Sequence, residues 1–199
     1  METSIPAFQF IPPQPPQRTW EACLTLNESW GYNPKDTQFK SARQLIHTLC
    51  EVAGKGGNLL LNVSPTGNGP IQSEQLDLLQ FVEAWMAVHA QSIVGTLPGL
   101  EPWQFYGPST RRGNRFYLFL LMKPYDSVTV RGVPIKRIQA VSLIAGRESL
   151  QYSTRCAIVD SMLSADPLGE LTIQVPEEAL NPYATVIAVD IAPVNDNDT

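Results

Sequence analysis

The sequence predicts an α/β part followed by an all-β part, and three features support this fold class. Within residues 20–95, two strand patterns alternate with two helix patterns, an order typical of a parallel sheet with helical crossovers. From residue 96 onward, short runs of β-branched and aromatic residues are separated by Gly, Pro or Asp turns. This spacing is typical of an antiparallel β-sandwich. Repeated prolines in residues 1–19 predict an extended loop, since proline fixes φ and lacks a backbone donor.

Chemically useful side chains are concentrated in residues 20–33, which begin as a strand and continue as an aromatic, polar loop. Side chains alternate between the two faces of a strand. One face is therefore predicted to be apolar, and the other polar enough to line a barrel interior. The apolar face comprises Trp20, Ala22, Leu24 and Leu26, and the polar face comprises Glu21, Cys23, Thr25 and Asn27.

Two helices are predicted after this loop. Ser41 begins the first one, with Gln44 three residues later as a capping box, and Gly54 supplies the stop. The second begins at Ser73, runs to about residue 93 and stops at Gly95. Apolar residues recur at helical spacing in both. They are Ala42, Leu45, Ile46, Leu49, Val52 and Ala53 in the first, and Leu76, Leu79, Val82, Trp85, Met86 and Ile93 in the second.

The strand between the helices spans residues 58–63, and its three successive leucines predict a strand that is covered on both sides. A domain boundary is expected at 95–102, a loop interrupted by glycine and proline. Residues 1–95 would then form the α/β domain, residues 96–194 the β-sandwich, and residues 195–199 a polar, disordered tail. The strands expected in the sandwich are 115–122, 127–133, 138–145, 171–175 and 185–191.

Composition excludes several classes of function. The 199 residues carry a net charge of −5 and a pI near 5.0, so the basic stripe that nucleic-acid binding requires is not expected. Cys23, Cys50 and Cys156 lie far apart in apolar runs and are expected to be buried thiols, not a disulfide framework or a metal site. His47 and His89 have no second ligand at a useful spacing, and we expect both to be structural.

Targeting signals are not recognisable in this sequence. Its first residues lack the cationic start and apolar core of a signal peptide, and no run approaches the ~18 apolar residues of a membrane span. The chain as given is therefore expected to be soluble and to make no membrane contact. Its compartment stays unassigned.

Two motifs have a specific order of residues. Residues 20–33 read Trp-Glu-x-Cys-x-Thr-x-Asn-x-Ser-Trp-Gly-Tyr-Asn, and residues 55–66 read Lys-Gly-Gly-Asn-Leu-Leu-Leu-Asn-Val-Ser-Pro-Thr. In order and spacing, both motifs and the helix between them resemble the alpha-L-fucosidases of glycoside hydrolase family 29. The resemblance is good from about residue 20 to residue 95. It implies the last two strand–helix units of a (β/α)8-like barrel, followed by a β-sandwich.

The resemblance also implies a reaction. Retaining glycosidases such as these need two carboxyl groups on either side of the scissile bond, roughly 5–5.5 Å apart. The nucleophile of the family is an aspartate on an earlier barrel strand, and neither Asp36, in a turn, nor Asp77, on a helix, matches it. Glu21 is the remaining candidate acid/base, because the resemblance gives the Trp-Glu pair a claim to this role in some relatives. Many relatives carry another candidate glutamate in a Thr-Pro-Glu segment, where this chain has Ala7.

Glu21 has two interpretations. It precedes the end of its strand by about six residues, so it could lie ~20 Å below the rim and act as a buried, paired carboxylate. If the strand begins nearer Cys23, Glu21 would instead lie in the incoming loop and approach the sugar.

Substrate-binding residues are expected on the loops after the two strands, because parallel α/β barrels carry their active sites at the C-terminal strand ends. Trp30 and Tyr32 offer flat apolar faces for a pyranose ring, and the amides of Asn27 and Asn62 could bind hydroxyl groups. The resemblance implies that Trp30 lines a fucose pocket. Glu28 also lies at the rim, outside the fixed letters of the motif.

Three functions fit these patterns. The first is the C-terminal portion of a retaining alpha-L-fucosidase that acts on terminal fucosyl linkages in glycoconjugates, needs no metal or cofactor, and is inactive alone because the nucleophile strand is missing. The second is a carbohydrate-binding module in which Trp103, Tyr106 or Tyr125 contacts the sugar. The third is a non-catalytic chain that associates with another chain carrying the missing barrel half, or with copies of itself.

Overall fold

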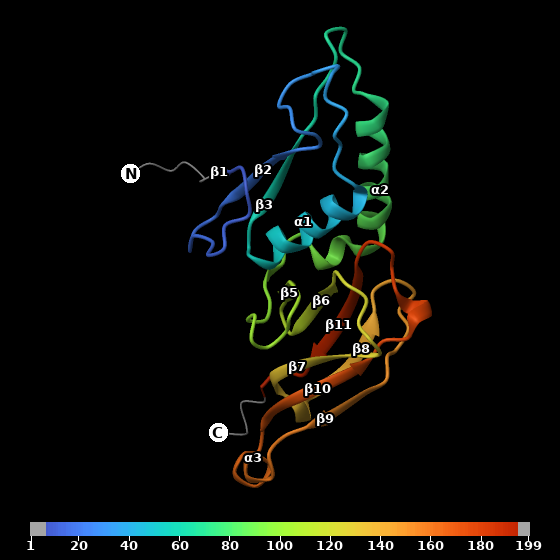
Figure 1. Cartoon of the computed structure of the whole chain (residues 1–199). Helices are drawn as coiled ribbons and strands as arrows, with labels where there is room; N and C mark the ends of the chain where they lie inside the picture. Colours follow the sequence, from blue (N-terminus) through green and yellow to red (C-terminus); the bar gives the residue numbers. More distant parts are fainter. Residues whose placement is uncertain (1–6, 195–199) are drawn as a thin grey trace.

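The structure of this chain, a computed structural model, describes residues 7–194. A small parallel sheet and two long helices lie at one end of the molecule, and two antiparallel sheets lie at the other (Figure 1). This mixed α/β fold with antiparallel sheets agrees with the sequence prediction. The expected disordered tail, 195–199, lies outside the described residues. Within the described part, no helix combines the length and apolar character needed to cross a bilayer.

Three parallel strands form the first sheet, in the order β1-β2-β3. β2 (Glu21–Thr25) and β3 (Asn58–Asn62) are the two strands predicted from the sequence. β1 (Ala7–Phe8) lies in the proline-rich segment, where the sequence predicts only a loop. A two-residue strand is too short to produce a recognisable alternation of side chains.

The two faces of this sheet differ in burial. Trp20, Ala22 and the helical Val52 form a small buried cluster on one face. On the other face Cys23 lies opposite Leu60 in the register, and Leu60 is 44% exposed. The prediction that β3 is covered on both sides is therefore wrong for residues 7–194, which supply no second layer over Leu60.

α1 (Ala42–Gly54) begins and ends where the sequence predicts. The hydroxyl of Ser41 accepts a hydrogen bond from the Gln44 backbone N–H at 3.2 Å, and Gln44 Oε1 accepts one from the Ser41 N–H at 2.7 Å. This reciprocal capping box satisfies two N–H groups that have no partner inside the helix.

Trp20 holds the start of β2 against the end of α1. Its indole N–H donates to the Lys55 carbonyl at 3.1 Å, and the side chain is buried. A Cβ at position 57 would lie 2.4 Å from a ring carbon of Trp20, so only Gly57 fits there. The second motif therefore carries its glycine pair in part because the indole of the first motif occupies this space.

The second helix is only partly amphipathic in the way the sequence predicts. α2 (Ser73–His89) continues into a short 3-10 turn, η1 (Ala90–Ser92). Trp85 is buried as expected, whereas Leu76 is 43% exposed and Gln75 is buried in its place. The first turn of α2 therefore does not follow the apolar stripe, because Gln75 is used to bind the end of β3.

Both histidines make structural contacts. His89 Nδ1 lies 2.8 Å from the carbonyl oxygen of Trp85, and its ring stacks on the indole of Trp85 at 4.4 Å. Burial lowers the pKa of His89 below its ordinary value. His47 Nε2 lies 2.8 Å from the carbonyl oxygen of Tyr183.

The rest of the chain forms a five-stranded antiparallel sheet, in the order β4-β5-β6-β11-β8, and a three-stranded one, in the order β7-β10-β9. Each strand expected from the sequence is present. β4, β5 and β9 are not predicted, because they are short and mostly exposed or polar. The bounds are β4 (Leu97–Pro98), β5 (Ser109–Arg112), β6 (Arg115–Leu120), β7 (Ser127–Pro134), η2 (Ile135–Arg137), β8 (Ile138–Leu143), β9 (Tyr152–Arg155), α3 (Ile158–Leu163), β10 (Leu168–Gln174), η3 (Glu177–Ala179) and β11 (Thr185–Ile191).

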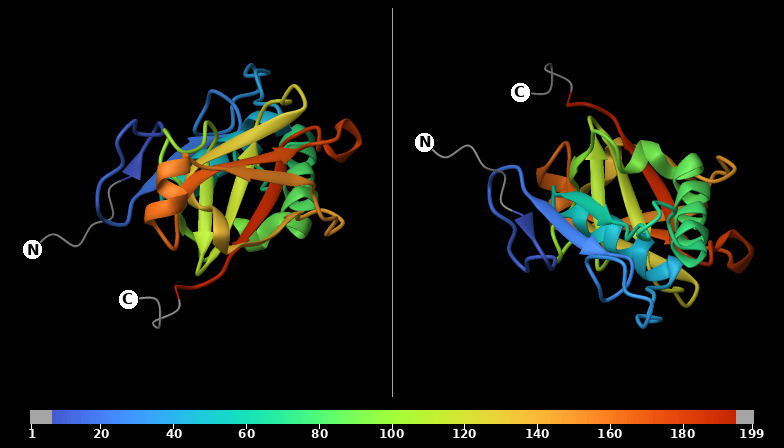
Figure 2. Two further views of the ribbon diagram at one scale, coloured as in Figure 1. Left: turned by 90° about the horizontal axis from the view of Figure 1, so that it is seen from below. Right: turned by 90° about the horizontal axis from the view of Figure 1, so that it is seen from above.

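One apolar core lies between these two sheets. Leu118 and Ile187 of the five-stranded sheet and Val130 and Leu171 of the three-stranded sheet are among its fully buried members. Figure 2 shows the three-stranded sheet lying across the five-stranded one.

A second apolar core joins the helices to the other face of the five-stranded sheet. Ile46 and Cys50 of α1 and Trp85 of α2 meet Phe119 of β6 there. The indole N–H of Trp85 donates to the Ala184 carbonyl at 3.1 Å. The five-stranded sheet is therefore covered on both faces, and the α/β part is fixed to the antiparallel part.

The three cysteines are free thiols. Cys50 is buried, and this burial raises the pKa of its thiol well above the ordinary value. Cys23 and Cys156 are only half-buried. The expectation of buried thiols is therefore confirmed for Cys50 and wrong for the other two.

Replacing Phe119 with alanine is predicted to destabilise the whole molecule. The substitution leaves a large void in the second core and should lower the free energy of unfolding by about 3–5 kcal/mol. Because helices and sheet share this core, calorimetry should show one unfolding transition at a lower temperature. Phe10→Ala removes a ring that is 58% exposed, and as the matched control it should cost less than about 1 kcal/mol. Two separate transitions, only one of which moves, would contradict a shared core.

Candidate functional site

The C-terminal ends of β2 and β3 lie side by side at one edge of the parallel sheet. Thr25 pairs with Asn62 in the register, so the loops that follow both strands leave the sheet together (top of Figure 1). Loops at this end of parallel strands carry the active sites of α/β proteins. The site residues predicted at this edge are Asn27, Trp30, Tyr32 and Asn62.

A hydrogen bond connects the two loops. The side-chain amide of Asn62 donates to the backbone oxygen of Trp30 at 2.8 Å. Trp30 is 47% exposed and Tyr32 is 44% exposed, so both rings reach the surface while the backbone beneath Trp30 is held. Aromatic rings presented in this way can stack on the apolar face of a sugar.

Asp36 closes the loop around Trp30. Its carboxylate accepts hydrogen bonds from the backbone N–H of Glu28 at 3.1 Å and of Gln38 at 3.2 Å. A hydrogen bond with the Ser29 side chain is the main cause that lowers the pKa of Asp36 below its ordinary value, and the backbone donors add to it. The sequence places Asp36 in a solvated turn, and the structure adds that its charge fixes the shape of this loop.

Lys40 is a residue of this site that sequence reasoning missed. Its ammonium group donates to the backbone oxygens of Thr25 at 2.7 Å and Asn27 at 3.2 Å. The backbone N–H of Lys40 donates to the carbonyl of Leu26 at 2.8 Å. Lys40 therefore connects the far end of the loop to the end of β2. No periodicity or motif marks a lysine at this distance along the chain.

Asn27 lies inside the protein, not at the exposed rim where the sequence places it. It is 1% exposed, and neither polar atom of its amide has a partner within residues 7–194. The buried hydroxyl of Ser64, at the end of β3, is also without a partner in this range, while its backbone N–H donates to Gln75 Oε1 at 2.9 Å. Buried polar groups are normally hydrogen-bonded. The strand ends therefore carry an amide and a hydroxyl whose hydrogen bonds are unmet in this conformation, although neither group is open to solvent.

Glu21 is not brought to this edge by the fold. It is the first residue of β2 and lies beside Ala7 of β1 in the register, at the opposite end of the strand from Thr25. Four residues at about 3.3 Å each separate Glu21 from Thr25 by about 13 Å. Because β2 begins at Glu21, the interpretation that requires a strand starting near Cys23 does not apply.

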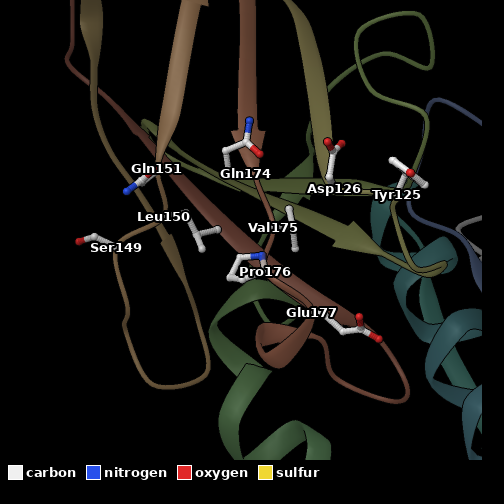
Figure 3. Close-up of a pocket in the computed structure, with 9 residues that line it drawn as sticks. All are labelled: Tyr125, Asp126, Ser149, Leu150, Gln151, Gln174, Val175, Pro176 and Glu177. Carbon is white, nitrogen blue, oxygen red and sulfur yellow. The ribbon is translucent and has the colours of Figure 1, made fainter.

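A cavity of about 700 Å³ lies far from these strand ends, among the loops of the antiparallel sheets (Figure 3). Gln151, Gln174, Asp126 and Glu177 surround it, with apolar side chains between them. Tyr125 also lines this cavity, although its side chain is 99% exposed. Within residues 7–194, no group of three or more His, Cys, Asp or Glu side chains is arranged to hold a metal ion.

Comparison with known proteins identifies relatives of this chain. A family model described as alpha-L-fucosidase matches residues 7–91. The alpha-L-fucosidase of Dictyostelium discoideum is 29% identical over 150 residues, which cover 70% of this chain and 32% of that protein. The tissue alpha-L-fucosidase of Homo sapiens is 27% identical over 154 residues, which cover 73% of this chain and 33% of that protein. The chain thus spans about a third of the length of these relatives.

Solved structures of similar proteins cover more of the chain. Alpha-L-fucosidase isoenzyme 1 from Paenibacillus thiaminolyticus superposes with a TM-score of 0.80 and 30% identity, over 94% of this chain and 44% of that one. The alpha-fucosidase of Thermotoga maritima, solved in complex with fucose, superposes with a TM-score of 0.69 and 25% identity, over 88% of this chain and 40% of that one.

Acidification is predicted to loosen the loop around Trp30. The pKa of Asp36 is lowered from an ordinary value of 3.8. Its contribution to the closed loop is therefore fully present above that value and is lost as the pH falls through the lower pKa of the folded state. The indole N–H signal of Trp30 in NMR spectra should shift and broaden in this acidic range.

Asp36→Asn should give the loosened Trp30 signal already at neutral pH, without an acidic transition. Asp77→Asn, which changes an exposed carboxylate on α2, is the matched control and should leave the Trp30 signal as in the parent. A Trp30 signal that is the same in all three proteins at every pH would rule out this role of Asp36.

Proposed function

Because this chain belongs to the alpha-L-fucosidase family, we propose that it is the C-terminal portion of a retaining alpha-L-fucosidase that hydrolyses terminal alpha-L-fucosyl linkages in glycoconjugates. The family consists of glycoside hydrolases. The observation that carries the proposal is the edge at which the Asn62 amide holds the backbone of Trp30. The two motifs of the sequence meet there, and the aromatic rings above them are free to contact a sugar.

In this proposal, residues 1–95 are the last strand–helix units of a (β/α)8-like barrel, and residues 96–194 are a β-sandwich domain. The parallel pairing of β2 with β3 supports a barrel origin. So does the burial pattern, since Leu60 and Cys23 lie on a face that a barrel would turn inward. Leu60 is apolar and yet 44% exposed. This exposure is expected if the side chains that cover Leu60 belong to barrel strands outside this chain.

The chain would supply the sugar-binding half of the active site. Trp30 would stack on the fucose ring, and Tyr32 would extend this apolar surface. Asn27 would bind a hydroxyl group with its unpaired amide once the loop that buries it opens. Asn62 would act chiefly by positioning Trp30. No aspartate at the described strand ends has the place of a nucleophile, so this group would come from an earlier strand of the barrel.

Retaining hydrolysis needs a nucleophilic carboxylate and an acid/base roughly 5–5.5 Å apart. With only one side of the site, the 199-residue chain should not hydrolyse fucosides by itself. A partner that completes the barrel, whether a preceding segment or another chain, is part of the proposal. Fucosylated glycans are the proposed substrates.

A chimera tests the role of Trp30. Residues 7–194 replace the matching segment of the Paenibacillus thiaminolyticus enzyme, and fucose release from an aryl alpha-L-fucoside is measured. The chimera should be active, and Trp30→Ala should lower kcat/KM by about 10- to 100-fold, because a stacking contact is lost. Tyr125→Ala, which removes a ring that is 99% exposed, is the matched control and should stay within about threefold of the chimera. An active chimera that is unaffected by Trp30→Ala would contradict the proposed pocket.

Glu21→Gln in the same chimera tests whether Glu21 is the acid/base. Removing a general acid costs about 10²- to 10⁴-fold in rate. Because Glu21 lies at the far end of β2, we expect a loss of less than about tenfold in kcat and an unchanged alkaline limb of the pH–rate profile, where a general acid loses its proton. A loss above a hundredfold, together with a changed pH profile, would assign the acid/base role to Glu21 instead.

A further inference from the structure

We propose that a cavity beside Trp103, in the antiparallel part of the chain, is a second carbohydrate-binding site, which takes a pyranose ring of a neutral oligosaccharide. The cavity measures about 530 Å³ and lies between the loop 102–106 and the edge strand β7. This site is independent of the proposed active site. Its residues belong to a different sheet from β2 and β3.

The aromatic wall of the cavity is exposed and yet fixed. Trp103 is 64% exposed and Tyr106 is 56% exposed. Between them, Phe105 is buried and its ring lies 4.9 Å from that of Tyr106, so it anchors the loop in the core. Large aromatic side chains that stay exposed on a held backbone mark binding surfaces.

Trp103 rests on a glycine in the neighbouring strand. Gly132 has a φ of +63° at a break in the pairing of β7 with β10. A Cβ at this position would lie 2.7 Å from a ring carbon of Trp103. The loop is held here by Gln104, whose backbone oxygen accepts from the Arg131 N–H at 2.9 Å and whose side chain donates to the Gly132 carbonyl at 3.2 Å. The position of the indole is therefore determined before any ligand binds.

The opposite wall provides hydrogen-bonding groups without a strong charge. Ser127 and Thr129 of β7 line the cavity, alternate with buried valines and are themselves half-buried. The backbone N–H of Arg131 points away from β10, toward Gln104. Backbone groups alternate along a strand, so those of Thr129 point the same way, into the cavity. Arg131 itself is paired with Glu170 at 3.5 Å.

This combination favours a sugar over other ligands. A pyranose presents an apolar face for stacking and a rim of hydroxyl groups for hydrogen bonds, which matches the aromatic and hydroxyl walls. An added peptide strand fits poorly, because Gln104 already occupies the edge of β7 at Arg131. Only a few free residues remain there, fewer than a usual strand of five or six. Arg131 is the one charged side chain among the residues that line the cavity, and Glu170 lies 3.5 Å from it, so the cavity offers an anion a single, partly neutralised cation.

Calorimetry of the full 199-residue chain tests this site. The chain is titrated with 2′-fucosyllactose, lactose and the open-chain polyol mannitol, up to about 50 mM. Binding of at least one of the two oligosaccharides with a millimolar Kd is expected, and mannitol should not bind. Trp103→Ala should weaken binding by about tenfold or more. Tyr125→Ala should leave it unchanged. Any binding of fucose at the proposed active site should instead be weakened by Trp30→Ala and persist in Trp103→Ala, which separates the two sites.

A second variant tests the same site in case Trp103→Ala does not fold. Thr129→Val keeps the shape and strand preference of the side chain, and should weaken binding about threefold or more by removing a hydroxyl. Sedimentation of the parent chain and of Trp103→Ala tests whether a second copy covers this surface instead. The proposal is overturned if no oligosaccharide binds, if binding is lost only with Trp30→Ala, or if Trp103 is needed only for self-association.

Discussion

The apolar core around Phe119 and Trp85 determines how the rest of the chain is arranged. It fixes α1 and α2 to one face of the five-stranded sheet, while the other face packs on the three-stranded sheet. Because α1 is anchored there, Trp20 and Gly57 in turn fix the start of β2 and the turn into β3. The parallel strands are therefore held in place by α1 on one face of their sheet, while the other face is uncovered.

The uncovered face explains why this chain combines a well-ordered scaffold with an incomplete site. Leu60 and Cys23 lie on the side that a barrel would enclose, and Asn27 and Ser64 carry buried polar atoms without partners in the described chain. A packed protein normally covers its apolar side chains and pairs its buried polar atoms. The simplest source of cover for Leu60 and Cys23 is further barrel strands, and these would also bring the carboxylate that retaining hydrolysis requires.

Much of the fold follows from local sequence signals. The alternation correctly identifies the buried face of β2 at Trp20, Ala22 and Leu26, although Thr25 and Asn27 of the polar face are buried as well. The capping box at Ser41 and Gln44 gives the start of α1. These predictions succeed because side-chain alternation and capping depend on residues a few positions apart. The three successive leucines of β3 predict a strand covered on both faces, and this prediction is wrong because residues 7–194 contain no layer over Leu60.

The contacts that build the site are less visible in the sequence. Trp30 and Asn62 are 32 residues apart, and Lys40 lies 15 residues beyond Thr25. Only the fold shows that these residues meet. Leu76 is exposed and Gln75 is buried for a similar reason, because Gln75 binds the backbone of Ser64. Hydrogen bonds between distant loops leave no periodicity, so neither the amphipathic pattern nor the motif reveals them.

The nucleotide sequence upstream of the Met1 codon, read in the same frame for about a kilobase, tests the proposed enzyme most directly. An open frame that encodes further strand–helix units, one of them ending in an aspartate, is the expected result. It would supply both the cover for Leu60 and the nucleophile. An in-frame stop codon close to Met1, with no such units encoded beside it, would contradict the proposal that this chain is part of a working fucosidase.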